Sequence, residues 1–520
     1  MLLNEFKQFL FKNKKPFIFA YIFTLICFGY MFFNNTISID EETWLLNTQI
    51  INGWLEQGRF GIYLFNLIFT ENSTQIPFLW DFLAVSTWFC SAILFLFIFK
   101  KEKENISSFS SFIFIAYFSS LPFVVGQILS YTQFNWQISV GLLCASLAVL
   151  YTQMYFYNPS IKYIMYSICF LAYSISIYQA YITIYICAVI GICLLRVLKD
   201  ELKNAKFIGF STLICFASAL IYSIVYLVII KLIGTNGQTY LTDNYVGWFS
   251  DSSLLHALLL SIANIARVSF SITIQDVSIY GGIVICCSTI LFILYSIYIF
   301  FRARSQKKKI LILFFTILLV IGPFSLYLLL GTYKTQGRML IGLPLIGGLQ
   351  WLLILNETFH KKILKAASVI TVSYLLFLNA CNMNRIYYYD FIRYEHDQAI
   401  ANEIMYDLQR LGYNYHNKPV IFIGKNCIDP IPVQTHDTLG IDGSFFCWDD
   451  GNIGRIVAYL KTQGYLLQMP SANQIEAALP LIENMPDWPV EGSIVEKNNT
   501  IIIRLSEPTD KWYLINGIPK

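Results

Sequence analysis

Three consecutive carboxylates, Asp40, Glu41 and Glu42, are the densest group of residues in this sequence that could do chemistry. Neighbouring carboxylates repel one another, so some pKa values in the triplet are expected to rise. A carboxylate held near a membrane surface is suited to taking a proton from an incoming hydroxyl group. Asp40 is the first choice for such a base and Glu41 the second. The alternative interpretation is an ordinary acidic loop.

An arginine between two glycines follows the triplet, in Gly58-Arg59-Phe60-Gly61. Arg59 could bind a phosphate or brace the carboxylates, because its guanidinium group offers a planar fork of donors. The alternative is a surface turn in which Arg59 pairs with Glu56.

A late polar segment, Gly331 to Arg338, contains two further cations, Lys334 and Arg338. It lies between two apolar stretches, on the side where basic residues are otherwise few. Two cations there indicate an anion held at the outer membrane surface, and a lipid phosphate is the natural candidate. The alternative is a loop that simply tolerates two charges.

Three more residues are expected to line a substrate cavity, namely Glu42, Trp44 and Gln179. Gln179 lies between Tyr178 and Tyr181, where two apolar stretches meet. Polar residues at such junctions also mediate helix packing or cap helix ends, which is the alternative for Gln179.

The composition indicates a membrane protein. Of the 520 residues, 56% are apolar and only 13% are charged. A soluble domain could not bury that much apolar surface, so a soluble enzyme is excluded. The net charge of +4 is too small to indicate nucleic-acid binding. The sequence shows no phosphate-binding glycine loop and no His/Cys cluster with metal spacing, so neither an ATP-driven pump nor a metal site is expected.

The apolar stretches predict about eleven transmembrane helices, since roughly 20 apolar residues cross a bilayer. The stretch 163–195 is interpreted as two short helices, because one long helix would reverse the side of every later loop. The predicted spans are 17–33, 77–99, 108–127, 136–156, 163–179, 181–195, 207–230, 277–301, 310–330, 339–356 and 364–382.

Basic residues in the short loops predict a cytoplasmic N-terminus. With eleven spans, the C-terminus then lies outside. The predicted domains are a transmembrane domain, residues 1–382 with outer loops 34–76 and 231–276, and an extracytoplasmic α/β domain, residues 383–520. Leu254 to Ile274 is suited to lying along the membrane surface.

Apolar patterns in the tail predict its elements. Helical spacing occurs at Ala399–Leu411, Ile453–Tyr465 and Asn473–Glu483, a strand at Val420–Gly424, and a hairpin around Asn498-Asn499. Cys427 and Cys447 are the only cysteines of the tail. A bridge between them and two buried thiols both remain open.

Taken together, these motifs resemble the GtrII-type glucosyltransferases of serotype conversion, which are polytopic, GT-C-like enzymes. In that family the acidic motif typically contains two Asp and a Glu, whereas the second position here is Glu41, so the identity of the base stays open among the three. The motifs that carry the resemblance are Asp40-Glu41-Glu42, Gly58-Arg59-Phe60-Gly61, Tyr178-Gln179-Ala180, Gly337-Arg338, Met485-Pro486-Asp487-Trp488-Pro489 and Gly492-Ser493.

The resemblance implies transfer of a sugar, glucose or another hexose, from a polyprenyl-phosphate carrier to a bacterial surface polysaccharide outside the cytoplasmic membrane. Arg338, Lys334 and Arg59 would bind the donor phosphate, which is the leaving group. Enzymes of this broad fold that use monophosphate donors generally invert the anomeric centre and need no metal. No cofactor is therefore expected.

Two other functions share several of these features. A flippase or transporter of lipid-linked oligosaccharide would also have many spans and basic lipid contacts. It would not need a carboxylate triplet and a folded tail, and transporters often contain internal repeats, which this sequence lacks. A polysaccharide polymerase or ligase is the third possibility. The triplet directly after the first span favours the transferase.

Overall fold

The chain folds into two compact units in the computed structural model. Unit 1 comprises residues 1–33, 50–386 and 435–438, and unit 2 comprises residues 34–49, 387–434 and 439–520. The structure describes residues 2–46, 51–69, 76–103, 105–235, 237, 246, 248, 253–274, 278–331, 337–358, 362–428, 436–437 and 443–518.

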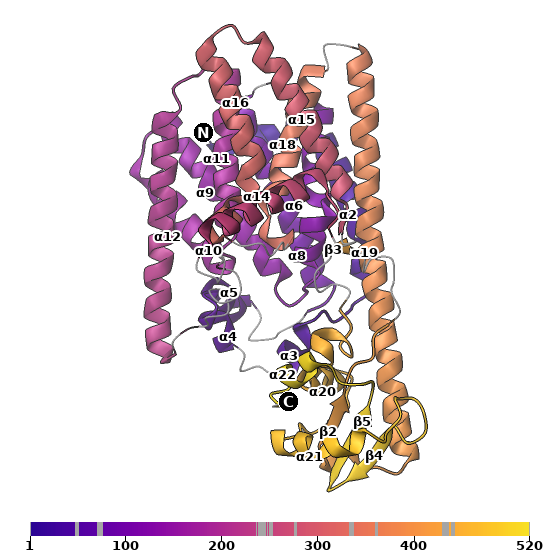
Figure 1. The fold of residues 1–520 in the computed structure, drawn as a ribbon. Coiled ribbons are helices and arrows are strands. Elements are labelled where there is room, and N and C mark those ends of the chain that lie inside the picture. Colours follow the sequence, from indigo (N-terminus) through magenta and orange to yellow (C-terminus); the bar gives the residue numbers. More distant parts are fainter. Residues whose placement is uncertain are drawn as a thin grey trace. The chain divides into compact units, whose positions relative to one another are not determined.

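Unit 1 is a bundle of α-helices (Figure 1). The first part of a long helix, α19 (Lys362–Arg410), completes it. The other helices of unit 1 are α1 (Leu2–Lys12), α2 (Lys14–Phe33), α4 (Ile51–Glu56), α5 (Phe60–Phe69), α6 (Leu79–Glu102), α7 (Ser108–Ser120), α8 (Gln127–Leu129), α9 (Asn135–Tyr157), α10 (Ile161–Ile177), α11 (Tyr181–Leu198), α12 (Ala205–Ile233), α14 (Leu254–Phe270), α15 (Gly282–Arg302), α16 (Gln306–Ile321), α17 (Ser325–Leu330) and α18 (Gly342–Thr358).

Eight helices of the described residues are long and apolar enough to cross a membrane, or nine if the bent pair α7 and Pro122–Leu129 is one span. The eleven predicted spans all coincide with helices, but α10 and α18 have only 17 residues each. The count of eleven is therefore not confirmed. The interpretation of 163–195 as two helices is confirmed, because α10 ends at Ile177 and α11 begins at Tyr181.

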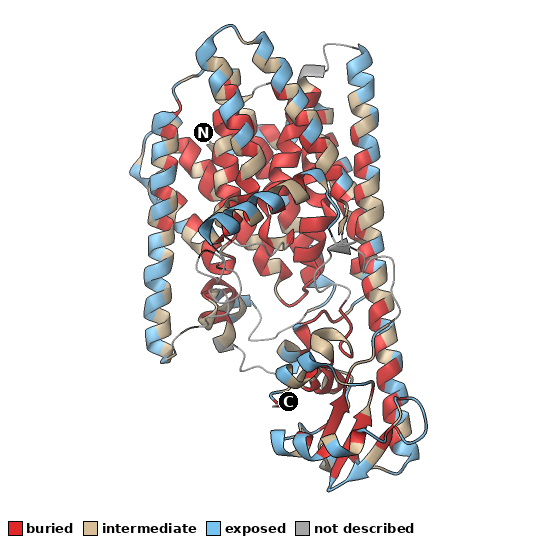
Figure 2. Ribbon diagram, viewed as in Figure 1, coloured by how far each residue is buried: buried red, intermediate tan, exposed pale blue. Residues whose placement is uncertain are grey.

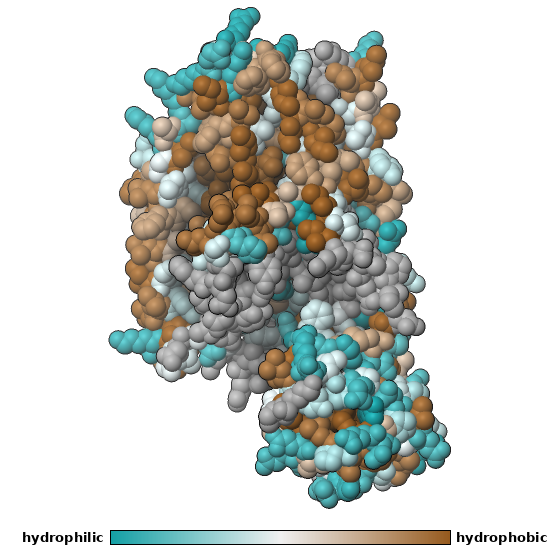
Figure 3. All heavy atoms as spheres, in the orientation of Figure 1, coloured by the Kyte–Doolittle hydropathy of each residue, from teal (hydrophilic) through white to brown (hydrophobic). Residues whose placement is uncertain are grey.

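The helices of unit 1 differ in how much of their surface they bury. In the 18-residue apolar stretch of each of the helices α6, α9 and α11, 72% is buried. In the corresponding stretch of α12 the buried share is only 11% (Figure 2). Apolar side chains cover much of the outer surface of the bundle in Figure 3. A helix that is apolar all round and exposed fits a lipid environment rather than water. Helix α14 lies across α15 and α16 in Figure 1.

The chain bends by 41° between α7 and the segment that follows it. Pro122 begins a π-helical turn, Pro122–Gly126, which leads into α8. Proline has no backbone N–H and clashes with the preceding turn, so a regular α-helix cannot continue through it. Gly337 packs directly against this turn.

Unit 2 contains a three-stranded sheet, with β5 (Thr500–Arg504) between β2 (Val420–Ile423) and β4 (Ile494–Lys497). Strand β5 pairs in parallel with β2 and antiparallel with β4, which confirms the predicted hairpin. Asn498 and Asn499 both have positive φ at its turn, as expected for a two-residue connection. The sheet packs with the helices α3 (Glu41–Leu46), α20 (Ile453–Thr462), α21 (Ala472–Ile482) and α22 (Asp510–Ile515).

Two features of this arrangement differ from the sequence analysis. Residues 34–49, assigned there to an outer loop of the transmembrane domain, belong to unit 2, where α3 packs against α20. In addition, the predicted span 364–382 and the predicted helix 399–411 are parts of one 49-residue helix, α19. A predicted boundary at residue 383 therefore lies inside a helix.

Candidate active site

Arg455 holds three carboxylates of unit 2 together. Its Nη2 donates to Asp40 Oδ1 at 2.8 Å, and its Nη1 donates to Glu42 Oε1 at 2.6 Å. Its Nε donates to Asp449 Oδ2 at 2.8 Å. A guanidinium group can serve three carboxylates at once because its donors lie in a rigid plane. Helix α20 begins at Ile453, is capped by the side chain of Asn452, and carries Arg455 in its first turn.

The members of the acidic triplet differ sharply in exposure. The side chain of Asp40 is 55% exposed and that of Glu42 is fully buried. Glu41 is also buried, and its Oε2 accepts a hydrogen bond of 2.9 Å from the backbone N–H of Ser38. Among the three, only Asp40 has a carboxylate that an acceptor hydroxyl from solution can reach.

Burial and charge act in opposite directions on this group. Burial raises the pKa of Glu42, although Arg455 works against the rise. Burial would lower the pKa of Arg455, but Asp40 and Glu42 raise it above its usual range. Arg455 therefore stays charged. Nearby, the hydrogen bond from Lys425 lowers the pKa of Asp450.

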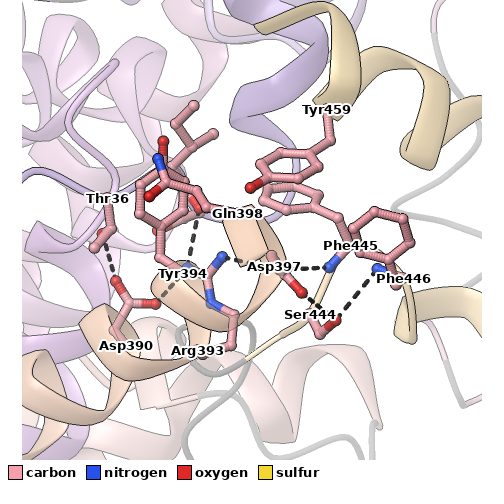
Figure 4. A network of polar contacts seen from close by, with 12 residues as sticks. Thr36, Asp390, Arg393, Tyr394, Asp397, Gln398, Ser444, Phe445, Phe446 and Tyr459 are labelled. Carbon is pink, nitrogen blue, oxygen red and sulfur yellow. Dashed lines mark hydrogen bonds and ion pairs between the residues drawn. The ribbon is translucent and has the colours of Figure 1, made fainter. Parts of the chain in front are cut away.

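A second buried network holds the chain segment that precedes the triplet (Figure 4). Asp390 Oδ2 accepts a hydrogen bond of 2.5 Å from Thr36, and Arg393 Nη2 donates to the backbone oxygen of Ile37 at 3.0 Å. Arg393 also pairs with Asp390 at 2.6 Å and with Asp397 at 3.6 Å. These side chains project from consecutive turns of α19, so the helix fixes residues 36 and 37 just ahead of Asp40.

The same network reaches the segment that carries Asp449. Asp397 accepts hydrogen bonds from Ser444 Oγ at 2.6 Å and from the backbone N–H of Phe445 at 3.0 Å (Figure 4). Cys447 follows and forms a disulfide with Cys427, with 4.9 Å between the Cα atoms. The structure thus forms the bridge that the sequence left open.

A separate cluster of arginines and aromatic rings lies in unit 1. Arg59 lies over the rings of Trp54 and Tyr178, at 5.7 and 5.4 Å from their centroids. Arg338 donates to the hydroxyl of Tyr131 at 3.2 Å, and its backbone oxygen accepts from Tyr178 at 3.3 Å. We call Trp54, Arg59, Tyr131, Tyr178 and Arg338 the arginine–aromatic cluster. Both guanidinium groups are half-buried among rings, where a phosphate would be attracted strongly.

Glycines bring the cluster together. Gly58 has a φ of +73°, and a Cβ there would collide with Tyr222 and approach Gln179. A Cβ on Gly337 would collide with the backbone oxygen of Phe123 in the π-helical turn. Only glycine therefore permits the close approach that places Arg59 and Arg338 beside Tyr178.

The other predicted site residues are divided between the two units. Gln179 belongs to unit 1, where its Nε2 donates to the backbone oxygen of Gln57 at 2.9 Å and to Tyr222 at 3.1 Å. Trp44 is half-buried in α3 of unit 2. Lys334 lies outside the described residues.

Several residues of these groups were not predicted. No sequence motif marks Arg455, Asp449 or Tyr131. An arginine in an amphipathic helix and a tyrosine in an apolar chain are both commonplace. The described residues contain no group of three or more His, Cys, Asp or Glu side chains placed to hold a metal ion.

A family model described as Glucosyl transferase GtrII matches residues 29–355. No curated protein and no solved structure matches the chain.

Proposed function

The chain belongs to the GtrII glucosyl transferase family, and from this premise we propose that it transfers a hexose from a polyprenyl-phosphate carrier to a bacterial surface polysaccharide. The family match is the observation that carries the proposal, because it covers most of the chain, including the acidic triplet and both arginines of the arginine–aromatic cluster.

The donor is proposed from the surroundings of Arg59 and Arg338. Both cations belong to a bundle whose helices fit a membrane, so a phosphate that reaches them is expected to arrive on a lipid. Their guanidinium groups would stabilise the negative charge that grows on the phosphate as its bond to the sugar breaks. Lys334 is proposed as a third contact.

Asp40 activates the acceptor hydroxyl group. The carboxylate takes the proton of the acceptor hydroxyl, the hydroxyl oxygen forms the new bond to the sugar, and the carrier phosphate leaves with the electron pair. Glu41 is the second candidate for the base. Burial of Glu41 and Glu42 supports a role in placing Asp40 rather than direct proton transfer.

A direct test uses the purified full chain in lipid vesicles, with radiolabelled glucose on polyprenyl phosphate and a surface polysaccharide as the acceptor. We expect label in the polysaccharide with the lipid donor and none with UDP-glucose. EDTA is expected to leave the rate unchanged, since no metal is proposed. Label that crosses the membrane without entering polysaccharide would instead identify a transporter.

We also propose a bacterial cytoplasmic-membrane location with an extracytoplasmic tail. Reporter fusions test this: fusions after Lys520 or within residues 425–450 should read as extracytoplasmic, and a fusion at Lys307 as cytoplasmic. A cytoplasmic signal from the tail would contradict the proposed side of the reaction.

A further inference from the structure

A cavity of about 470 Å³ opens at one end of the unit 1 bundle. Four helices end at it: α6 at Glu102, α11 at Leu198, α15 at Arg302 and α18 at Thr358. Hydrophilic side chains gather where α15 and α16 are joined (Figure 3). The arginine–aromatic cluster does not line this cavity.

Cations outnumber carboxylates around the cavity. Lys103, Lys199, Arg302 and Lys308 line it, against a single carboxylate, Glu102. The acidic side chain is already satisfied, because Glu102 accepts hydrogen bonds of 2.7 Å from both Gln153 and Tyr157 and lies 3.7 Å from Arg196. The side chains that line the cavity therefore carry a net positive charge.

Two ordinary explanations cover only part of this charge. Lysines near helix C-termini satisfy the last carbonyl groups, and Lys308 does so by donating to the backbone oxygen of Leu198 at 3.2 Å, while it also pairs with Asp200. An excess of basic residues on one side of a membrane protein sets its orientation. Neither explanation requires that the cations surround a hollow.

Part of the cavity lining is apolar. Leu195, Tyr295 and Ile299 line it together with the cations. An amphipathic hollow at the ends of membrane helices offers a cationic rim for a phosphate and an apolar surface for an attached chain.

We propose that this cavity binds a phosphate group, supplied by an anionic phospholipid of the adjacent leaflet or by a soluble phosphate compound. Lys103, Lys199 and Arg302 contact the phosphate oxygens, and the apolar wall accommodates the first carbons of a lipid chain. The site is independent of the proposed transfer reaction.

The test compares two double variants of equal charge. Lys199→Ala with Arg302→Ala removes two cations of the cavity, and Lys203→Ala with Arg304→Ala removes two exposed cations of the same loops that do not line it. Native mass spectrometry of the full chain in detergent measures binding of phosphatidylglycerol and of phosphatidylcholine. Thermal melts with and without inorganic phosphate test the soluble source.

For the lipid source, we expect wild type to bind phosphatidylglycerol in preference to phosphatidylcholine. The cavity pair should bind it about 25-fold more weakly, since each of the two basic side chains near an anionic lipid contributes roughly fivefold. The control pair should match wild type. A soluble source would instead appear as a melting temperature that phosphate raises in wild type and the control pair only.

The proposal is overturned if both pairs lose the same affinity, or if wild type neither prefers phosphatidylglycerol nor responds to phosphate. Should the cavity pair aggregate, Lys199→Glu alone gives the same comparison against Lys203→Glu.

Discussion

Arg455 Nη2 lies 2.8 Å from Asp40 Oδ1, although 415 positions separate the two residues in the sequence. The contact fixes the orientation of the half-exposed Asp40 carboxylate. Glu42 accepts from another nitrogen of the same Arg455 guanidinium group. Asp40 Oδ2 receives no hydrogen bond from any described residue, so it can face a substrate. This arrangement distinguishes Asp40 from its two buried neighbours.

Asp40→Asn is expected to abolish transfer while expression and membrane insertion stay normal. A general base contributes roughly 10²- to 10⁴-fold in rate. Glu41→Gln should impair transfer severely and Glu42→Gln more mildly. Turnover with saturating donor and acceptor measures this, with Glu476→Gln on the exposed face of α21 as the matched control. Near wild-type turnover of Asp40→Asn would remove Asp40 from the reaction.

Arg455→Ala should destabilise unit 2 by roughly 3 kcal/mol, because it leaves the fully buried Glu42 without its cation. Arg455→Lys should retain more stability but lose about tenfold or more in turnover, since a single ammonium group cannot hold Asp40 and Asp449 in the same geometry. Chemical denaturation and turnover measure the two effects separately. Adding Glu42→Gln to Arg455→Ala should restore stability but not activity; a double variant as unstable as Arg455→Ala would contradict this account.

The raised pKa of Glu42 makes stability depend on pH. A carboxyl group with a higher pKa in the folded state binds more protons there, so it favours folding most below its unfolded value of 4.5. That contribution is lost as the pH rises through the folded value. Melting temperatures measured upward from pH 4.5 should fall more steeply for wild type than for Glu42→Gln. The lowered pKa of Asp450 has the opposite effect: its contribution to stability is lost as the pH falls below 3.8. The pH ranges of the two effects therefore do not overlap.

Arg338→Ala should raise the KM for the lipid donor more than Arg338→Lys does. A positive charge is needed near the phosphate, and the forked geometry of arginine adds to it. A titration of the lipid donor at saturating acceptor gives the KM of each variant. If the two variants use the donor equally well, Arg338 has no part in binding it.

Thiol labelling of denatured, unreduced protein should leave Cys427 and Cys447 unmodified, because the structure pairs them. Cys447→Ser is expected to cost roughly 3 kcal/mol of stability, as for a loop of this length in the chain-entropy model. Reaction of both thiols without reductant would show that the bridge does not form in the cell.

The sequence predicted what periodicity and composition determine directly. Apolar runs located the membrane-length helices of unit 1, and the turn at Asn498-Asn499 located the hairpin of unit 2, whereas α4 and α5 lie within the predicted outer loop 34–76. The continuity of α19 was not predictable, because Asp390, Arg393 and Asp397 interrupt the apolar pattern while their charges are satisfied inside unit 2. Helical patterns fail where a buried polar network replaces apolar contacts.

The site was predictable only in part for a similar reason. The acidic triplet and the glycine-flanked arginines are local in sequence, whereas Arg455 reaches Glu42 across 413 positions. Spacing along the chain carries no information about such a pair. The sequence identified Arg59 and Arg338 separately. Only the structure shows that both contact Tyr178.

The membership of residues 34–49 in unit 2 also sets an order of events during synthesis. A ribosome adding about 5–20 residues per second needs roughly 20–80 s to travel from Asp40 to Arg455. During that interval the nascent chain carries Asp40 and Glu42, whose shared cation, Arg455, has not yet been made. A chain released before α20 is translated contains Asp40 and Glu42 but lacks the guanidinium group that pairs with both. Completion of the candidate site is thus one of the last steps in making the protein.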